Sequence, residues 1–304
     1  MNDLVTDVKN LELETLKNLK SSKASNTLRA YKADYKDFTS FCIKNGFKSM
    51  PSEPKILSLY LTYLSKSSKF STLKRRLASI SIIHRLSGRY IDTKHPMITE
   101  NLMGIKRIKG SYQKAKKPIL INDLKLIVNV IDKDKSEKNR FKNRALILIG
   151  FAGGFRRSEL VTIDYEDVDF VSEGVKIFVK RSKTDQSGEG MTKGIPYFSN
   201  PDYCPVISLK NWIERSKIKS GKIFNMSDKS VALTVKKYAA LAGLDSNKYS
   251  GHSLRSGFAT STAELGAEER SIMAMTGHKT TQMVRRYIQE ANLFKNNALN
   301  KIKL

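Results

Sequence analysis

The stretch YSGHSLRSGFATSTAELGAEERSIMAMTGHKTTQMVRRY covers residues 249–287 and sets the expectations for the whole chain. His252 and Arg255 stand three residues apart in a predicted helix, so their side chains share one face. His278 follows in a Gly-His turn, and Tyr287 comes nine residues later on a further helical run. The chain has four histidines, and two of them lie here, which concentrates acid–base chemistry in this segment.

These residue types suit a phosphodiester target. An arginine donates two parallel N–H groups to non-bridging phosphate oxygens, a geometry that lysine does not match. A phenol titrates near ~10, so a tyrosine attacks phosphorus near neutral pH only beside a base and in a positive field. His252 or His278 could supply the base, and the arginines the field. The alternative is a capped helix with one solvated arginine, because H-x-x-R pairs often arise by chance.

Two upstream stretches agree with a phosphate site. FAGGFRRSELVTIDYEDVDF, residues 151–170, places Arg156 after a Gly-Gly break, with Glu159 three residues on. GVKIFVKRSKTDQSGEG, residues 174–190, reads as a strand that runs into a polar turn carrying Lys183. Glu159 either favours the helix dipole in a first turn or holds Arg156 or Lys183 in place, and both interpretations stay open.

In this order and spacing, the motifs resemble those of the tyrosine recombinase (phage-type integrase) family. The matching pieces are G-F-R-x-S-E-L, a lysine in a strand turn, H-x-L-R-x-x-x-A-T, T-G-H and a tyrosine nine residues past that histidine. The resemblance covers nearly the whole chain, because the amino-terminal region is similar to the family's helical core-binding domain. It implies a site-specific DNA recombinase that needs no cofactor and no metal, and that integrates or excises a mobile element.

The resemblance also implies how the phosphate is attacked. Tyr287 forms a 3′-phosphotyrosine link and releases a 5′-hydroxyl, while Arg156 and Arg255 neutralise the non-bridging oxygens. A register error of one residue would move the role of Arg156 to Arg157. Other arginines beside the tyrosine, at 285 and 286, fit DNA contacts or helix surface better than phosphate clamps.

Proton transfers fall to the remaining matched residues. By resemblance, Lys183 protonates the departing 5′ oxygen, His252 accepts the tyrosine proton and His278 donates a hydrogen bond to the phosphate. The position of His278 is the one that varies most within the family. The predicted catalytic set is Arg156, Lys183, His252, Arg255, His278 and Tyr287.

The charge balance indicates a polyanionic partner. Lysine and arginine number 55 against 29 acidic residues, which gives a net charge of +26 over 304 residues. Nucleic acid is the first candidate and an anionic membrane surface the second. No apolar run is long enough to cross a bilayer, and the amino-terminal sequence does not resemble a signal peptide. We therefore expect double-stranded DNA as the partner and no membrane.

The cysteine count favours a reducing compartment. Cys42 and Cys204 are isolated, so they form neither a disulfide framework nor a zinc site. The simple expectation is a cytoplasmic protein.

Hydrophobic periodicity predicts a mainly α protein with a small antiparallel β-sheet. Strands are expected on both sides of a turn at 172–174 and again from Gly194, and Trp212 is expected in a core. The predicted domains are a flexible amino-terminal segment (1–22), a helical core-binding domain that binds DNA (23–108), a basic linker (109–117) and an α+β catalytic domain with a tail helix (118–304).

One helix of the first domain has a basic face. Leu73, Leu77, Ile80 and His84 share one side, and His84 is expected in or beside the core. The opposite side is expected to contact DNA phosphates and carries Lys74, Arg75 and Arg76.

Three alternatives remain beside the integrase interpretation. A chromosome- or plasmid-resolving recombinase would share the chemistry, a degenerate relative would bind DNA without catalysis, and a type IB topoisomerase would act without a paired synapse. In the family the tail docks on a neighbouring protomer, so we expect a homo-oligomer, a tetramer, on DNA. The sequence leaves open whether accessory proteins take part.

Overall fold

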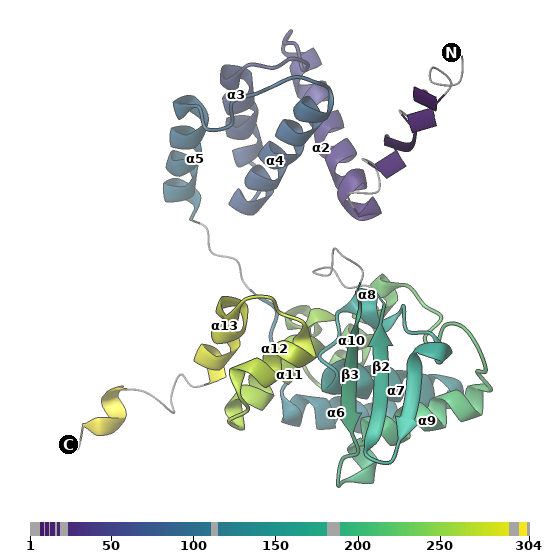
Figure 1. The fold of residues 1–304 in the computed structure, drawn as a ribbon. Helices are drawn as coiled ribbons and strands as arrows, with labels where there is room; N and C mark the ends of the chain where they lie inside the picture. Colours follow the sequence, from purple (N-terminus) through teal and green to yellow (C-terminus); the bar gives the residue numbers. More distant parts are fainter. Residues whose placement is uncertain are drawn as a thin grey trace. The chain divides into compact units, whose positions relative to one another are not determined.

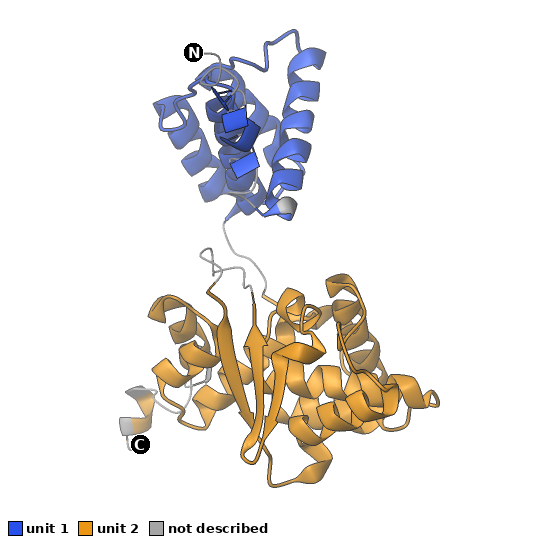
Figure 2. Ribbon diagram, turned by 45° about the vertical axis from the view of Figure 1, so that its right-hand side comes forward, with its two compact units in different colours: residues 1–114 blue, residues 115–304 orange. Residues whose placement is uncertain are grey.

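The computed structural model describes residues 7–8, 10–11, 13–15, 17–18, 24–110, 115–180, 189–291 and 298–302. The chain divides into two compact units, residues 1–114 and residues 115–304 (Figure 2). Parts of the segment 1–22 and of the linker 109–117 fall outside the described residues, so the roles expected for both stay predictions. Among the described helices, none is long and apolar enough to cross a membrane.

Unit 1 is a helical bundle (Figure 1). Its core is aromatic in part, because the rings of Phe38 and Tyr60 pack edge to face with centroids 5.0 Å apart. His84 is fully buried in this core, as expected, and its Nε2 accepts a hydrogen bond from the Ser52 N–H at 3.2 Å. The helices are α2 (Ser25–Lys44), α3 (Pro54–Ser65), α4 (Phe70–Leu86) and α5 (Pro96–Lys109).

The basic face of α4 is largely occupied by ion pairs within unit 1. Arg75 pairs with Asp34, and Arg76 pairs with Asp37. The Arg76 side chain is only 19% exposed, whereas that of Arg75 is 49% exposed. Both aspartates lie on α2, about forty positions earlier, where helical periodicity gives no sign of the pairing. Arg75 is therefore better placed than Arg76 for the predicted phosphate contact.

Unit 2 combines helices with one three-stranded antiparallel sheet in the order β1-β2-β3 (Figure 1). The mainly α fold with a small antiparallel sheet, predicted from the sequence, is thereby confirmed. Its elements are α6 (Ile121–Ile131), α7 (Glu137–Ala152), α8 (Arg157–Leu160), η1 (Tyr165–Asp167), β1 (Val168–Val171), β2 (Gly174–Val179), β3 (Met191–Pro196), η2 (Pro201–Tyr203), α9 (Pro205–Ser216), α10 (Asp228–Leu241), η3 (Ser246–Lys248), α11 (His252–Glu264), α12 (Glu269–Thr276), α13 (Thr281–Ala291) and η4 (Ala298–Lys301).

Strand β3 begins earlier than the sequence suggested. It starts at Met191 rather than at Gly194, and its alternation turns Lys193 and Ile195 toward the interior. Val175 of β2 lies opposite Ile195, so the two strands share one apolar face. The consequence is a lysine side chain directed into the core.

Helix α7 is the central element of unit 2. Ser136 caps its start by accepting a hydrogen bond from the Asn139 N–H, and residues 145–152 are all buried. A helix that is apolar on all sides must be covered on all sides. One core joins α7 to α9 and the sheet and includes Trp212 as expected, while a second joins α7 to α6, α10 and α11.

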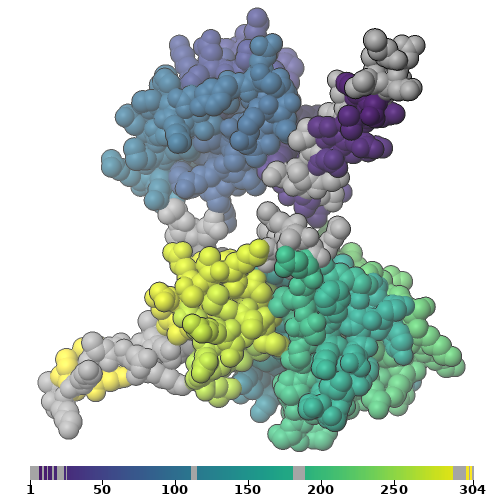
Figure 3. All heavy atoms as spheres, in the orientation of Figure 1, coloured from purple at the N-terminus to yellow at the C-terminus, as the bar shows by residue number. Residues whose placement is uncertain are grey.

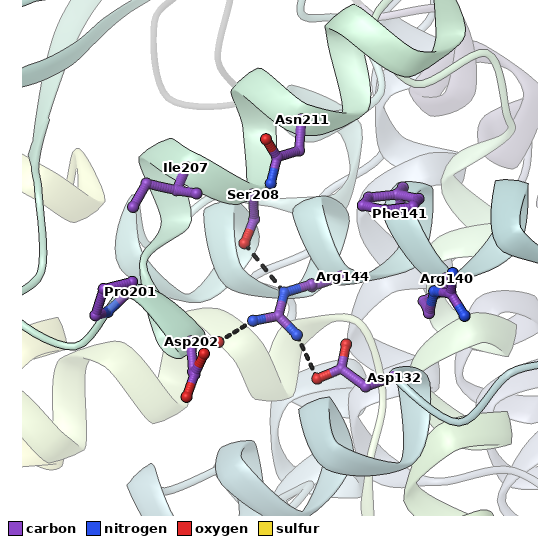
Figure 4. A pocket seen from close by; sticks show the side chains of 9 residues that line it. All are labelled: Asp132, Arg140, Phe141, Arg144, Pro201, Asp202, Ile207, Ser208 and Asn211. Atoms are coloured by element: carbon purple, nitrogen blue, oxygen red, sulfur yellow. Dashed lines mark hydrogen bonds and ion pairs between the residues drawn. The ribbon is translucent and has the colours of Figure 1, made fainter.

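Arg144 fastens α7 to its neighbours within a small pocket (Figure 4). Its guanidinium pairs with Asp132 after α6, donates to the Asp202 carbonyl and lies 3.4 Å from the Ser208 hydroxyl on α9. These contacts tie three segments of unit 2 to one guanidinium, so we assign the pocket a structural role. It fixes the helix that leads into the Gly-Gly turn.

The last described helices pack beside the sheet, as Figure 3 shows for residues 252–291 in yellow-green to yellow. Helix α11 contacts α7 and α13, and Ile119 donates its N–H to the Ser253 carbonyl at 3.0 Å. A small cluster of Ala259, Ala263, Ile272 and Val284 holds α13, with Tyr287 packed against it. Residues 292–297 and 303–304 of the predicted tail lie outside the described residues, and Ala298–Lys301 form a 3-10 helix.

Candidate active site

The turn after α7 places the first arginine. Gly154 adopts φ +54°, and a Cβ there would approach Phe258 to 3.0 Å and the Thr276 methyl to 3.2 Å. Glycine is therefore required both for the left-handed backbone and for the close approach. The chain then extends through Arg156, which is the residue before the single turn of α8.

Arg156 is held by Glu159. The Arg156 Nη1 donates to Glu159 Oε1 at 2.5 Å, and its backbone N–H donates to Oε2 at 2.9 Å. Glu159 is 2% exposed. The sequence left open whether Glu159 favours the helix dipole or holds a basic residue. The structure shows Glu159 in contact with Arg156, and it also stands in the first turn of α8. Arg157 instead lies 3.8 Å from Asp228 on α10.

Arg255 lies beneath the same turn. It is 1% exposed, and its Nη1 donates to the Gly154 carbonyl at 2.9 Å. Its Nη2 is buried and has no hydrogen-bond partner among the described residues. Burial and the nearby Arg156 lower the pKa of Arg255 to about 10, which still leaves it charged at neutral pH. A buried donor without a partner is costly, so this corner of the site is suited to an anion.

Tyr287 faces the imidazole of His252. The Tyr287 hydroxyl lies 3.4 Å from His252 Nε2, a distance that favours proton transfer after slight closure. Burial, followed by the charges of Arg255 and Arg156, lowers the pKa of His252. The ring is therefore neutral at pH 7 and can accept a proton.

His278 stands on the other side of the phenol. Its ring stacks on Tyr287 with centroids 6.1 Å apart, and it is 8% exposed. Its Nδ1 lies 2.8 Å from Thr276 Oγ1, and burial and Arg255 lower its pKa to about 4. The Thr276 hydroxyl donates its one proton to the Ile272 carbonyl at 2.6 Å, so it accepts a hydrogen bond from His278 Nδ1. The Nε2 of the neutral ring is then an acceptor, and it becomes a donor when the ring takes up a second proton.

Five of the six predicted catalytic residues thus meet around one point in unit 2. The sixth, Lys183, lies outside the described residues. A lysine that the sequence interpretation missed, Lys193, is buried behind Glu159. The available clue was its two-residue spacing from Ile195, which places both on one face of a strand. Arg285 is 65% exposed and lies 3.5 Å from Glu269, so it belongs to the helix surface.

The described residues contain no group of three His, Cys, Asp or Glu side chains arranged to hold a metal ion. Cys42 and Cys204 are both free and buried. The side chains that meet at this site offer two guanidinium groups for an anion, an imidazole that can accept a proton and a phenol.

Comparison with known proteins agrees with this chemistry. A model of the phage integrase family matches residues 119–293, and the chain belongs to that family. It is a tyrosine-type site-specific recombinase, a DNA strand transferase. An integrase/recombinase xerD homolog of Selenomonas ruminantium is 42% identical over 96% of this chain and 89% of its own length.

More distant proteins share the fold. Tyrosine recombinase XerC of Staphylococcus aureus is 25% identical, covering 92% of this chain and 91% of its own length. The solved XerH site-specific recombinase bound to difH DNA has a TM-score of 0.61 at 18% identity, covering 82% of this chain and 74% of that one. A lambda integrase dimer bound to a core site has a TM-score of 0.58 at 18% identity, covering 96% and 98%.

The lowered pKa of His252 predicts how DNA cleavage depends on pH. If His252 is the base, its neutral imidazole is the active form, and cleavage should persist as pH falls through about 6.5, the ordinary value, and decline only below it. The measurement is the rate of covalent attachment at protein concentrations below saturation, which reports the free protein. A decline that begins above about 6.5 would contradict the assignment of His252 as the base.

Proposed function

We propose that this recombinase cuts and rejoins DNA through a 3′-phosphotyrosine intermediate, and that it integrates and excises a mobile element. The observation that carries the proposal is the meeting of the Tyr287 hydroxyl with His252, together with the buried Nη2 of Arg255, which has no hydrogen-bond partner in the part of the chain that the structure describes. Nucleophile, base and anion receptor are then supplied by one unit of one chain.

In the proposed first step, Tyr287 attacks the scissile phosphorus. His252 Nε2 accepts the phenolic proton, and Arg156 and Arg255 neutralise the non-bridging oxygens as charge develops. His278 donates a hydrogen bond to the same phosphate from a protonated Nε2, a state that the negative charge of the phosphate favours. The phosphodiester bond energy is kept in the tyrosine ester, so a 5′-hydroxyl from another strand reverses the step without an energy source.

The departing 5′ oxygen requires a proton, which we assign to Lys183. Lys183→Ala should slow cleavage of ordinary DNA by roughly 10²- to 10⁴-fold, the usual contribution of a general acid. A substrate with sulfur at the bridging 5′ position has a leaving group that needs no proton, so it should restore the rate. Single-turnover cleavage of both substrates makes the comparison, and persistence of the defect on the sulfur substrate would move the acid to another residue.

We propose integration and excision, with chromosome resolution as the alternative. The relative at 42% identity is named an integrase/recombinase xerD homolog, and the relative of Staphylococcus aureus at 25% is named tyrosine recombinase XerC, so the names are compatible with both roles. We place the activity in the cytoplasm, which contains the DNA and keeps thiols such as Cys42 and Cys204 reduced. Accessory proteins that set the direction are compatible with this scheme.

The DNA that the protein attacks in its host tests this choice. DNA that stays attached after denaturing purification should, on sequencing, map to the two ends of a mobile segment. One site per chromosome or plasmid would favour resolution instead, and recovery no higher than with Tyr287→Phe would favour a non-catalytic DNA-binding protein. In vitro, fusion of two sites separates a recombinase from a topoisomerase, which would only relax supercoils.

We further propose that the active species is a tetramer on DNA. A lambda integrase tetramer has been solved on a Holliday junction. In this chain a groove of about 760 Å³ is lined mainly by apolar side chains, among them Phe151, Phe258 and Leu265, while Leu299 and Ile302 of the tail are exposed. The tail of a second copy is the occupant we assign to the groove. Light scattering of the complex with two joined sites should give four chains, and two chains would contradict the assignment.

A further inference from the structure

We propose that Lys193 is a positioning residue for strand cleavage: its ammonium group holds the Glu159 carboxylate and the Gly153 carbonyl, and thereby sets the location of Arg156. The inference rests on the proposed function. It concerns a residue that does not touch the phosphate itself and that acts through its neighbours.

Lys193 contacts residues that lie next to Arg156 in the active site. Its side chain is 0% exposed, and its Nζ donates to the Gly153 carbonyl at 2.7 Å. The same Nζ lies 3.8 Å from Glu159 Oε2 and 4.3 Å from the centroid of the Phe155 ring. The ammonium group thus contacts the turn and the carboxylate on which Arg156 depends.

Packing alone does not explain a cation at this position. Ile195, which shares the inward face of β3, is apolar, and an apolar side chain at 193 would avoid the cost of burying a charge. That cost is visible in the pKa of Lys193, which burial lowers to about 7 against the opposing effect of Glu159. An apolar side chain could be buried here at a lower cost in free energy, so the presence of a charged one indicates that the charge itself is required.

The requirement follows from the two arginines. Lys193 donates to the Gly153 carbonyl, and Arg255 donates to the next carbonyl, that of Gly154. Two cations thus fix consecutive peptide groups of the turn immediately before Arg156. The carboxylate of Glu159 is shared between Lys193 on one side and the Arg156 guanidinium and N–H on the other. Without Lys193, the Glu159 carboxylate and the Gly153 carbonyl each lose their contact with the ammonium group. The Arg156 guanidinium, which Glu159 holds, then loses its alignment with Arg255.

The test measures single-turnover DNA cleavage by Lys193→Met on three substrates. On ordinary DNA the rate should fall roughly 10- to 100-fold, the size expected when a reacting group is misplaced by about 1 Å. On DNA with a neutral methylphosphonate at the scissile position the loss should shrink, because less charge needs neutralising by the arginines. On the bridging 5′-sulfur substrate the loss should remain, because the variant still has its proton donor.

Two controls accompany the variant. Lys176→Met removes an exposed lysine from β2 of the same sheet, and its cleavage rate should be unchanged. Melting temperature and DNA affinity should be close to native for both variants. If Lys193→Met does not fold, Lys193→Gln keeps a polar donor but no charge at this position and should show the same pattern on the three substrates.

Each other pattern overturns the inference. A native rate on ordinary DNA would mean that the ammonium has no role in cleavage. An equal loss on ordinary and methylphosphonate DNA would mean a general structural defect, and rescue by the bridging sulfur would make Lys193 the proton donor. Failure of the native protein to form any adduct would instead refute the proposed function and is separately visible.

Discussion

Replacing Tyr287 by Phe should abolish covalent attachment to DNA while leaving DNA binding and folding unchanged. The phenol is the only proposed nucleophile, so removal of its oxygen leaves no atom to form the phosphate ester. Phe keeps the ring that stacks on His278 and packs against the small cluster around Val284, so the helix that carries it should stay in place. The measurement is the yield of SDS-resistant adduct on a nicked suicide substrate.

A matched control for this experiment is Tyr165→Phe. Tyr165 lies in the same unit and is 38% exposed, but it stands in η1 and belongs to none of the groups around the phosphate. Its variant should form the adduct at the native rate. An undiminished adduct with Tyr287→Phe would show that another residue is the nucleophile.

Arg255→Lys should be the next most damaging change, with cleavage slowed by roughly 10²- to 10³-fold. The Arg255 fork uses Nη1 to hold the Gly154 carbonyl and keeps Nη2 unpartnered among the described residues. A lysine ammonium is a point donor, so it cannot hold the turn and bind a phosphate oxygen with the same geometry. The rate constant for adduct formation at saturating protein is the quantity to measure.

The control for the arginine variant is Arg157→Lys. Arg157 is 42% exposed on its side chain and lies near Asp228, away from the turn carbonyls. Its replacement should change the cleavage rate far less than that of Arg255. A rate for Arg255→Lys within a few-fold of native would mean that charge alone is sufficient at this position.

The sequence was informative wherever chemistry and local spacing coincide. His252 and Arg255 are one helical turn apart, and the Gly-Gly break before Arg156 is required by the backbone, so both features were predictable. The meeting of these pieces was predictable only through the family resemblance. Nothing in the local pattern of α13 says that Tyr287 faces His252, because that contact depends on how α13 packs on α11.

Long-range pairing explains what the sequence did not reveal. Arg76 looks like a solvated cation in its own helix, yet it pairs with Asp37 across the bundle. Lys193 looks like a surface lysine beside a glycine, yet the three-residue extension of β3 turns it inward. For Arg76 the deciding partner lies far away in the chain, beyond the reach of periodicity, whereas for Lys193 the two-residue spacing from Ile195 was the available sign.

Under the proposed function, the contact between Tyr287 and His252 within one chain predicts that each subunit cuts with its own phenol and its own base. A subunit that lacks the Tyr287 phenol and a subunit that lacks the Arg255 guanidinium could not restore each other's cleavage, because neither supplies a residue to the other's site. In a mixed assembly, the strand that breaks would therefore be the one bound by the intact subunit. Biased pairing of intact and disabled chains would give an experimenter control over the order in which the two duplexes are opened.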